Sequence, residues 1–300
     1  MDFKDKIILV TGGTSGIGLK SVISFAKNNA RKVYTCGRSI EKWEIAKVLM
    51  KKELGKDFSK VEFIQTDIRV ESEVRHLIRC IFYKYRQLDI AVNNAGVNIP
   101  PVNIWDMDFG DTTKKCDTIR YQFYAGVEDK EKQTPIFTML YGLLFCLKWE
   151  LKYILKYNNP KKQVNIVNTS SAFDNLGTTF YPTYTAAKSG VSSLTKSIAG
   201  QVAQERLNNK KYTPIILINS VNPGAVLTPL FFDNFPPDVT PEEAVRGTSA
   251  RIPLNRVAKA QEIANSILIL SCNKTTTYMT GTEVNVDGGL VEVPNYNRKN

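Results

Sequence analysis

Histidine and closely spaced cysteines are scarce in this sequence, and their scarcity excludes several kinds of chemistry. His76 is the only histidine in 300 residues, so a Ser-His-Asp triad or a histidine-rich metal site has almost nothing to work with. The five cysteines are scattered and form no Cys-x-x-Cys pair, which argues against a disulfide framework or a zinc site. We therefore expect no metal, a reducing compartment, and a catalytic acid or base other than histidine.

Long apolar runs are also missing. The first run begins at Ile7 and is too short for a signal peptide, and none reaches the roughly 18 residues of a membrane span. The net charge of +11 includes lysine pairs such as Lys51-Lys52 and Lys161-Lys162, spread through predicted loops and helix ends, without a zinc-finger spacing or an aromatic RNA-binding motif. We attribute the charge to solubility and expect a cytoplasmic protein with neither a membrane nor a nucleic acid as its partner.

Short β-rich apolar runs alternate with stretches of helical pattern along the chain. Strands are predicted at 7–11, 33–36, 61–65, 90–93, 164–168, 215–221 and 283–286. Helices are predicted at 17–29, 41–54, 71–86, 137–157, 184–208 and 260–272. This alternation is typical of an α/β fold with a doubly wound parallel sheet, here of seven strands. It predicts a single domain over residues 1–290 and a fraying C-terminal tail at 291–300.

A glycine-rich segment, VTGGTSGIG at 10–18, ends the first strand and opens the first helix. A dinucleotide-binding fingerprint occupies this position. Gly12 would permit the tight turn, Gly16 would let the backbone approach a pyrophosphate, and Gly18 would allow close helix packing. The N-terminus of the helix then meets the anion. The residues predicted to contact the cofactor here are Gly12, Thr14, Ser15, Gly16, Ile17 and Gly18.

The second strand ends without the carboxylate that binds the ribose 2′-hydroxyl in NAD enzymes. Gly37 occupies that place, followed by Arg38 and Ser39. Gly37 leaves room for a 2′-phosphate, Arg38 can pair with it, and Ser39 adds a donor. We therefore predict NADP(H) in preference to NAD(H); the alternative is NAD held without its usual acid. Asp67 and Ile68 follow the third strand and either contact the adenine or serve only as turn residues.

Polar motifs stand at the ends of the later strands, where parallel sheets bind ligands. They are NNAG at 93–96, NTSS at 168–171, NPGAVLT at 222–228 and TGTEVNVDGG at 280–289. With the glycine-rich loop, this ordered set closely resembles the short-chain dehydrogenase/reductase family in its Tyr-x-x-x-Lys branch, over nearly all of 3–290 apart from about 97–136. The resemblance implies a Rossmann-type fold and cofactor contacts from Asn94, Ala95, Gly96, Pro223, Gly224, Val226 and Thr228, the last at the nicotinamide carboxamide.

The stretch YPTYTAAK at 181–188 places two tyrosines before one lysine. In the resembled branch the catalytic serine precedes the tyrosine by 13 residues, and here 184 − 171 = 13 selects Ser171 and Tyr184. Because Tyr184 and Lys188 share a helix face, we expect the ammonium to lower the phenol pKa from its usual value of about 10. The resemblance implies that Tyr184 protonates a carbonyl that receives hydride from the nicotinamide. It also implies that Ser171 binds the substrate oxygen and that Lys188 binds the ribose.

Two alternatives remain open. Tyr181 and Lys188 have the Tyr-x6-Lys spacing of the enoyl-reductase branch, which reduces a carbon–carbon double bond, although we favour Tyr181 as a wall of the substrate pocket. Many members also carry an asparagine in the fourth helix that supports a water on the lysine, and alignment on Gly142 places Met139 there. A thioether cannot replace that amide. Three explanations are open. Other residues carry the proton between the lysine and solvent, the alignment is displaced across the inserted region, or the protein is a weakly catalytic NADP-binding sensor or scaffold.

Two variable segments are predicted to frame a small-molecule substrate. The insertion at about 98–135 would form a lid, an oligomer contact or a surface loop without function. The loop at about 229–256 would cover the substrate with Phe231 and Phe232 or pack them against the domain. The segment 137–147 is apolar on nearly every face and would be buried in the core or against a partner. The resemblance implies a homodimer or homotetramer formed through this helix and the one after Tyr184.

Overall fold

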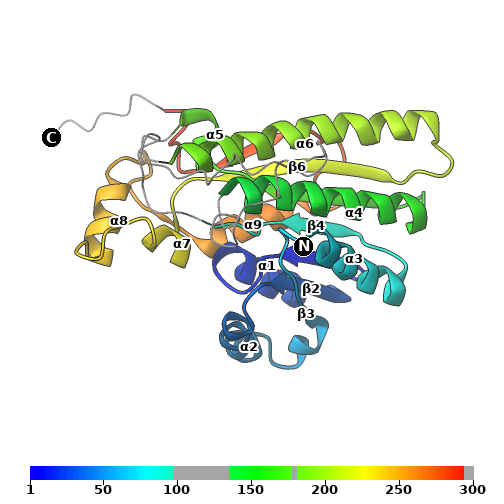
Figure 1. The fold of residues 1–300 in the computed structure, drawn as a ribbon, viewed down its shortest axis with the longest axis horizontal. Helices are drawn as coiled ribbons and strands as arrows, with labels where there is room; N and C mark the ends of the chain where they lie inside the picture. Colours follow the sequence, from blue (N-terminus) through cyan, green and yellow to red (C-terminus); the bar gives the residue numbers. More distant parts are fainter. Residues whose placement is uncertain (98–134, 178–180, 294–300) are drawn as a thin grey trace, which may run out of the picture.

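The protein folds around one parallel sheet that carries helices on both faces (Figure 1). The structure is a computed structural model that describes residues 1–97, 135–177 and 181–293. Seven strands pair in the order β3-β2-β1-β4-β5-β6-β9. They are β1 Ile7–Thr11, β2 Lys32–Gly37, β3 Val61–Gln65, β4 Ile90–Asn93, β5 Gln163–Thr169, β6 Ile215–Pro223 and β9 Glu283–Val286. This order confirms the predicted Rossmann-type, doubly wound fold.

The helices divide between the two faces of the sheet. On one face lie α1 Gly16–Lys27, α2 Ile40–Leu54 and α9 Ala260–Leu270; on the other lie α3 Glu71–Tyr85, α4 Gly142–Tyr157 and α6 Pro182–Asn208. Because side chains alternate along a strand, Ile8 of β1 packs with the first group and Leu9 with the second. Both faces of the sheet are therefore covered, which explains the nearly continuous apolar sequences of the strands.

The order of the strands reverses at β1, and this position determines where a ligand can bind. β1 pairs with β2 on one side and with β4 on the other, with Ile8 opposite Ile90 in the latter pair. Chain connections leave the two sides of β1 in opposite directions, which opens a crevice at the carboxyl ends of the strands. The glycine-rich loop follows the carboxyl end of β1, and the NNAG segment follows that of β4, so both segments lie at this crevice.

The loop at 229–256 is closed at its base by a short sheet that the sequence did not predict. β7 Val226–Leu227 pairs in parallel with β8 Ala258–Lys259, and two-residue strands are too short to show a periodic pattern. Between them lie α7 Pro229–Phe232 and α8 Pro241–Ser249, which project beyond the end of the sheet (Figure 1). The predicted insertion at about 98–135, apart from its last residue, and residues 294–300 of the predicted tail lie outside the described residues.

The apolar segment 137–147 differs from the uniform helix that its sequence predicts. Ile136–Tyr141 forms a π-helix, η4, and α4 begins at Gly142. One side of the segment is buried within the chain, including Met139 and Leu143, whereas Phe137, Tyr141 and Phe145 are half-buried. One side of the segment thus lies in the core of the domain, and the other is partly exposed. Remaining elements are η1 Gly55–Lys60 and α5 Phe173–Leu176.

Candidate active site

The loops after β1 and β4 touch through glycines that leave no room for a side chain. Gly12 has φ +71°, and a Cβ there would lie 2.8 Å from the Cα of Ala95. A Cβ on Gly18 would lie 2.3 Å from the carbonyl oxygen of Gly12 and 2.6 Å from Nδ2 of Asn94. The hydroxyl of Thr11 joins the two loops, since it accepts hydrogen bonds from the backbone N–H of Asn94 (3.0 Å) and Ala95 (3.1 Å).

Thr228 meets the same glycine-rich loop from the other side. A Cβ on Gly16, whose φ is +53°, would lie 3.0 Å from Cγ2 of Thr228. The Thr228 hydroxyl caps α7 by accepting from the N–H of Phe231 at 3.3 Å. The predicted pyrophosphate loop and the predicted carboxamide anchor are therefore adjacent, although 16 and 228 are distant in sequence. Thr11, which sequence analysis did not select, is the polar residue that fixes the floor of this crevice.

The close contact at Gly18 supports a direct test. We expect Gly18→Ala to lower the free energy of unfolding by about 1–3 kcal/mol, because the added methyl group overlaps the backbone of Gly12. Gly200→Ala in α6 is the matched control, since its Cβ would meet nothing within 4 Å. Gly200→Ala should instead stabilise by about 0.5–1 kcal/mol through helix propensity. Urea denaturation measures the free energy of unfolding of both variants. An equal change in the two would contradict close packing at Gly18.

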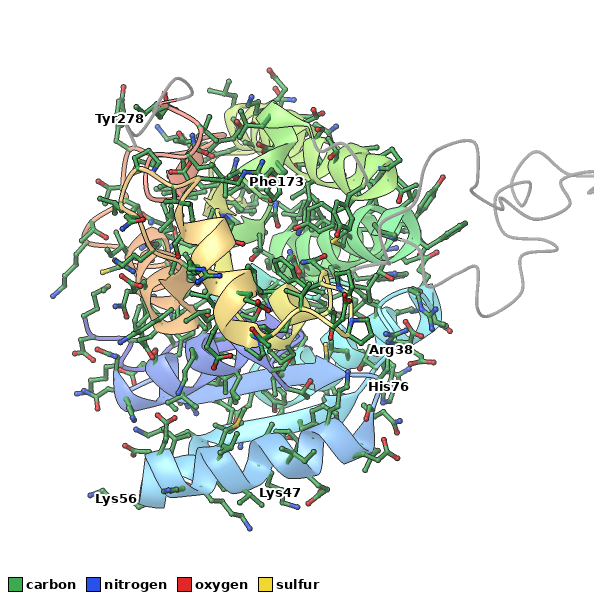
Figure 2. The ribbon with its side chains drawn as sticks, turned by 90° about the vertical axis from the view of Figure 1, so that its left-hand side faces the viewer. Arg38, Lys47, Lys56, His76, Phe173 and Tyr278 are labelled. Atoms are coloured by element: carbon green, nitrogen blue, oxygen red, sulfur yellow. The ribbon has the colours of Figure 1, made fainter. Side chains whose placement is uncertain are left out.

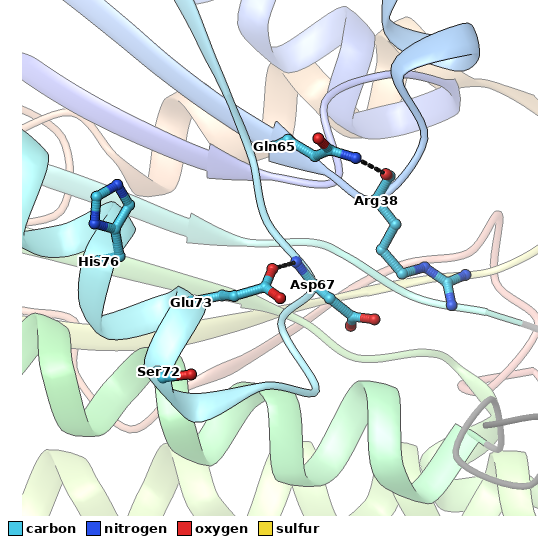
Figure 3. A pocket seen from close by; sticks show the side chains of 6 residues that line it. All are labelled: Arg38, Gln65, Asp67, Ser72, Glu73 and His76. Atoms are coloured by element: carbon cyan, nitrogen blue, oxygen red, sulfur yellow. Dashed lines mark hydrogen bonds between the residues drawn. The ribbon is translucent and has the colours of Figure 1, made fainter. Parts of the chain in front are cut away.

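Arg38 lines an open cavity of ≈560 Å³ with Gln65, Asp67, Ser72, Glu73 and His76. Figure 2 shows Arg38 and His76 at one corner of the molecule, and Figure 3 shows them on opposite sides of the cavity. Two hydrogen bonds hold the rim: Gln65 Nε2 donates to the Arg38 carbonyl at 2.8 Å, and the Asp67 N–H donates to Glu73 at 2.7 Å.

The guanidinium of Arg38 is available to a ligand. Within the described ranges it has no salt-bridge partner, because the nearby Asp67 carboxylate pairs with Arg69 instead (Oδ2–Nη2 2.5 Å). Although burial acts to raise it, the pKa of Asp67 is held below its usual range by the hydrogen bonds and charge of Arg69, with a smaller contribution from the charge of Arg38. Ser39 caps α2, accepting from the N–H of Lys42 at 3.0 Å. Its predicted contact with a phosphate stays a prediction.

The three predicted catalytic residues come together between the end of β5 and the start of α6. Ser171 is buried, its hydroxyl accepts from the N–H of Phe173 at 3.2 Å, and it lies close enough to Tyr184 to oppose the rise of the pKa of that phenol. Lys188 is 5 % exposed, with Nζ 5.8 Å from the centroid of the Tyr184 ring. Its ammonium donates to the Thr169 carbonyl at 2.8 Å. Serine and tyrosine are therefore in contact, with the lysine behind the aromatic ring.

The expected lowering of the Tyr184 pKa is wrong for this structure. Burial raises the pKa of Tyr184 above its usual value, a hydrogen bond with Ser171 opposes the rise, and the charge of Asp174 adds to it. The Lys188 ammonium is directed to the Thr169 carbonyl. Burial also lowers the pKa of Lys188 to about 8, against the charge of Asp174. Tyr184 is consequently a protonated donor at neutral pH.

The predicted substrate residues lie on the neighbouring loop and at the start of α6. Tyr181 precedes the first turn of α6, and its hydroxyl donates to the Asn234 carbonyl at 3.3 Å. Phe231 is buried in a small cluster of this loop and stacks edge-on against Phe232 and Phe235. Phe232 is 37 % exposed. Packing is thus observed for Phe231, Phe232 remains a candidate for substrate contact, and Tyr181 links the active site to the loop.

A buried polar layer behind the catalytic residues was missed by sequence analysis. Asn93 Nδ2 donates to Glu150 Oε2 at 3.2 Å and to Asn168 Oδ1 at 3.1 Å. Glu150 is fully buried, and burial raises its pKa to about 7 against the hydrogen bond from Asn93. Both asparagines belong to the strand-end motifs, which was the available signal. Glu150 gives no sequence signal, since a glutamate in a helix usually faces solvent.

The described part of the chain contains neither a metal-binding cluster nor a helix suited to a membrane. No group of three or more metal-ligating side chains occurs among the described residues. None of the described helices combines the length and the apolar character that crossing a membrane requires.

Comparisons with known proteins agree on the family. A family model for short chain dehydrogenases matches residues 6–237. An uncharacterized short-chain type dehydrogenase/reductase of Acanthamoeba polyphaga mimivirus is 29% identical over 98% of this chain and 99% of its own. The 3-oxoacyl-acyl-carrier-protein reductase of Thermotoga maritima is 27% identical over 97% and 100%, respectively. The crystal structure of levodione reductase shares the fold, with a TM-score of 0.78, 23% identity, and coverage of 97% of this chain and 99% of that one.

The matched range contains the glycine-rich loop, Arg38 and all three predicted catalytic residues. The chain therefore belongs to the short-chain dehydrogenase family, a family of oxidoreductases that use nicotinamide cofactors.

Proposed function

We propose that the protein reduces a ketone or aldehyde of a small molecule with NADPH. The observation that carries this proposal is the contact between Ser171 and Tyr184 beside buried Lys188, at the carboxyl ends of the strands that also form the glycine-lined crevice. One relative, the Thermotoga maritima enzyme, is named as a reductase of a 3-oxoacyl group, a carbonyl compound. The similarity of this chain to that enzyme supports the reduction of a carbonyl group by this chain as well.

The residues present fit a nicotinamide dinucleotide. An added Cβ would overlap the backbone of Ala95 at Gly12 and of Gly12 at Gly18, and Gly16 has a φ of +53°, so the loop has the tight, closely packed backbone of a dinucleotide-binding turn. Arg38 stands at the end of β2 with its guanidinium free of ion pairs within the described residues. Gly37 adds no negative charge there, so a 2′-phosphate would be favoured. Bound NADPH would supply the hydride to the carbonyl carbon.

The side chains of the protein would handle the proton and the substrate oxygen. Tyr184, whose pKa is raised further by burial and which is protonated at neutral pH, would donate its hydroxyl proton to the carbonyl oxygen. Ser171 would donate a hydrogen bond to the same oxygen and orient it. Lys188, charged below its pKa of about 8, would balance the negative charge left on Tyr184. In the reverse direction, the tyrosinate would accept the proton from an alcohol.

The cofactor assignment predicts a specific response to one substitution. Arg38→Ala should weaken NADPH binding by roughly 10- to 100-fold, the loss expected for charge-assisted hydrogen bonds to a phosphate. NADH should bind poorly to both proteins, because it lacks the phosphate. Fluorescence transfer from the protein to bound nicotinamide measures both affinities without a known substrate.

Lys47→Ala is the matched control for that titration. Lys47 carries the same charge on the outer side of α2, away from the cavity (Figure 2), and pairs with Glu44 at 3.0 Å. Its removal should leave NADPH binding unchanged. If NADH binds as tightly as NADPH, the 2′-phosphate assignment is wrong. If neither binds, a scaffold without cofactor chemistry becomes the better description.

The proposal includes a homodimer or homotetramer. The resemblance to the family implies a contact between subunits through α4 and α6. We expect light scattering to give twice or four times the chain mass. A monomeric mass at micromolar concentration would contradict this part of the proposal, but not the catalytic part.

A further inference from the structure

A carboxylate outside the three catalytic residues lies where several parts of the active site meet. Asp174 belongs to the short helix α5, which lies against the start of α6 (Figure 1). Its Oδ2 accepts from Nδ2 of Asn222 in β6 at 2.8 Å and from the hydroxyl of Ser192 in α6. Its backbone carbonyl accepts from the Ser189 hydroxyl at 2.8 Å. One residue of a short helix is therefore bonded to two of the large elements of the domain.

The donors around this carboxylate have a defined orientation. Oδ1 of Asn222 accepts from the Ser220 hydroxyl at 2.9 Å, so its Nδ2 must face Asp174. A flipped amide would place an oxygen of Asn222 against the carboxylate. Ser170, which follows β5, has its hydroxyl 3.1 Å from Asp174 Oδ2 and 2.9 Å from the Lys188 carbonyl, and it can donate to either. A side chain that accepts hydrogen bonds fits this position.

Asp174 is connected to Ser171 along the chain and to Lys188 through α6. The Ser171 carbonyl accepts from the N–H of Asp174 at 3.0 Å, so both residues belong to one turn. On α6, Ser189 and Ser192 lie within about one turn of Lys188, and both donate to Asp174. A displacement of Asp174 would therefore move the catalytic serine and the catalytic lysine relative to each other.

The charge of Asp174 acts on the same site. Lys188 is 5 % exposed, and a buried ammonium is costly without an opposite charge nearby. Burial lowers the pKa of Lys188 to about 8, and the charge of Asp174 opposes this effect. The same charge adds to the rise that burial causes in the pKa of Tyr184. Asp174 therefore favours the protonated forms of both residues, from which reduction of a carbonyl starts.

We propose that Asp174 is a positioning residue of the active site, whose carboxylate holds the turn of Ser171 against α6 and supplies the negative charge that balances the buried ammonium of Lys188. The inference rests on the proposed function for its catalytic consequence, whereas the arrangement of hydrogen bonds and charges does not.

Other ionisable groups surround the same elements. The titratable groups that face Lys188 are Tyr184 on its own helix, Asp174 of α5 and Cys146 of α4, and Glu150 lies behind Asn93. Lys196, farther along α6, is also affected by the charge of Asp174, but it pairs with Glu283 of β9 at 2.8 Å. Lys188 is thus the buried cation on which the charge of Asp174 acts.

Asp174→Asn tests the charge, since asparagine keeps the shape and an oxygen that can accept from Asn222 and Ser192. Lys188 can be titrated by NMR in protein whose lysines are labelled with carbon-13 at Cε, with its signal assigned by Lys188→Arg. We expect a pKa of about 8 in the wild-type protein and a value about one pH unit lower in Asp174→Asn. An unchanged value would overturn the proposal. Because the titration needs no turnover, failure of the proposed function is recognised separately.

Asp174→Asn should also move the alkaline limb of the pH profile of turnover to lower pH, because Lys188 then loses its proton earlier. A shift of about one pH unit lowers turnover by about 5-fold at pH 8 and changes it little at pH 6. Glu283→Gln is the matched control: it also removes a negative charge beside α6, but this charge pairs with Lys196. If the two variants have the same pH profile, the role assigned to the charge is wrong.

Ser192→Ala tests the positioning role, and it decides the proposal even if Asp174→Asn does not fold. It removes one hydrogen bond to the carboxylate and keeps the charge. We expect kcat to fall by about 2- to 5-fold, with NADPH affinity and the alkaline limb unchanged. Ser266→Ala in α9, whose hydroxyl donates to the Glu262 carbonyl at 3.3 Å, is the control and should keep the wild-type kcat. Equal kcat values for the two serine variants would overturn the positioning role.

Discussion

Replacing Tyr184 with phenylalanine is expected to lower the turnover of carbonyl reduction by about 100- to 10,000-fold, the usual contribution of a general acid. Phenylalanine keeps the ring that Lys188 faces at 5.8 Å and removes only the proton donor. NADPH affinity should therefore change little, because none of the glycine-lined crevice is disturbed. Steady-state kinetics with a panel of ketones and aldehydes, combined with the fluorescence titration, separates the two quantities.

Tyr181→Phe is the control that distinguishes the two tyrosines. The Tyr181 hydroxyl donates to the Asn234 carbonyl of the substrate loop at 3.3 Å, so its loss should raise KM and leave kcat nearly unchanged. Enoyl substrates should be assayed alongside the carbonyl compounds. Loss of turnover in Tyr181→Phe but not in Tyr184→Phe, with reduction of a carbon–carbon double bond, would favour the enoyl-reductase alternative and contradict our assignment.

Replacing Glu150 with glutamine is expected to stabilise the protein at pH 8 by up to about 3 kcal/mol. Burial raises the pKa of Glu150 to about 7 from its usual 4.5, so the folded state binds this proton more tightly than the unfolded state. The free energy of unfolding should therefore fall as the pH rises from about 4.5 to 7 and change little above that. Glutamine removes this dependence and still offers Asn93 a carbonyl oxygen. The gain should accordingly vanish near pH 5.

The measurement is urea denaturation of both proteins between pH 5 and 8. Glu44→Gln, at an exposed position of α2, is the matched control and should leave the pH dependence of the wild-type protein intact. Identical pH slopes for Glu150→Gln and wild type would mean that Glu150 titrates in its ordinary range, for example because water reaches it.

Local patterns were sufficient to predict the elements that carry the site. The seven strands were predicted within a few residues of their observed bounds, because strands buried on both faces are apolar runs between turn residues. The short β7–β8 pair and the π-helix at Ile136–Tyr141 were not predicted. Two paired residues and one inserted residue in a helix leave no periodic signal. Ser171, Tyr184 and Lys188 are selected by the spacing of the family branch that the sequence resembles, and they lie together at the start of α6.

The sequence by itself determined which polar residues gather at the crevice, because parallel strands all present their carboxyl ends at one edge and the motifs follow those ends directly. Tertiary structure alone decided the state of these residues. The Lys188 ammonium is directed to the Thr169 carbonyl, the pKa of Tyr184 is raised instead of lowered, and Glu150 is enclosed behind Asn93. Burial and hydrogen-bond direction depend on side chains brought together from distant positions, and neither can be read from spacing along one helix.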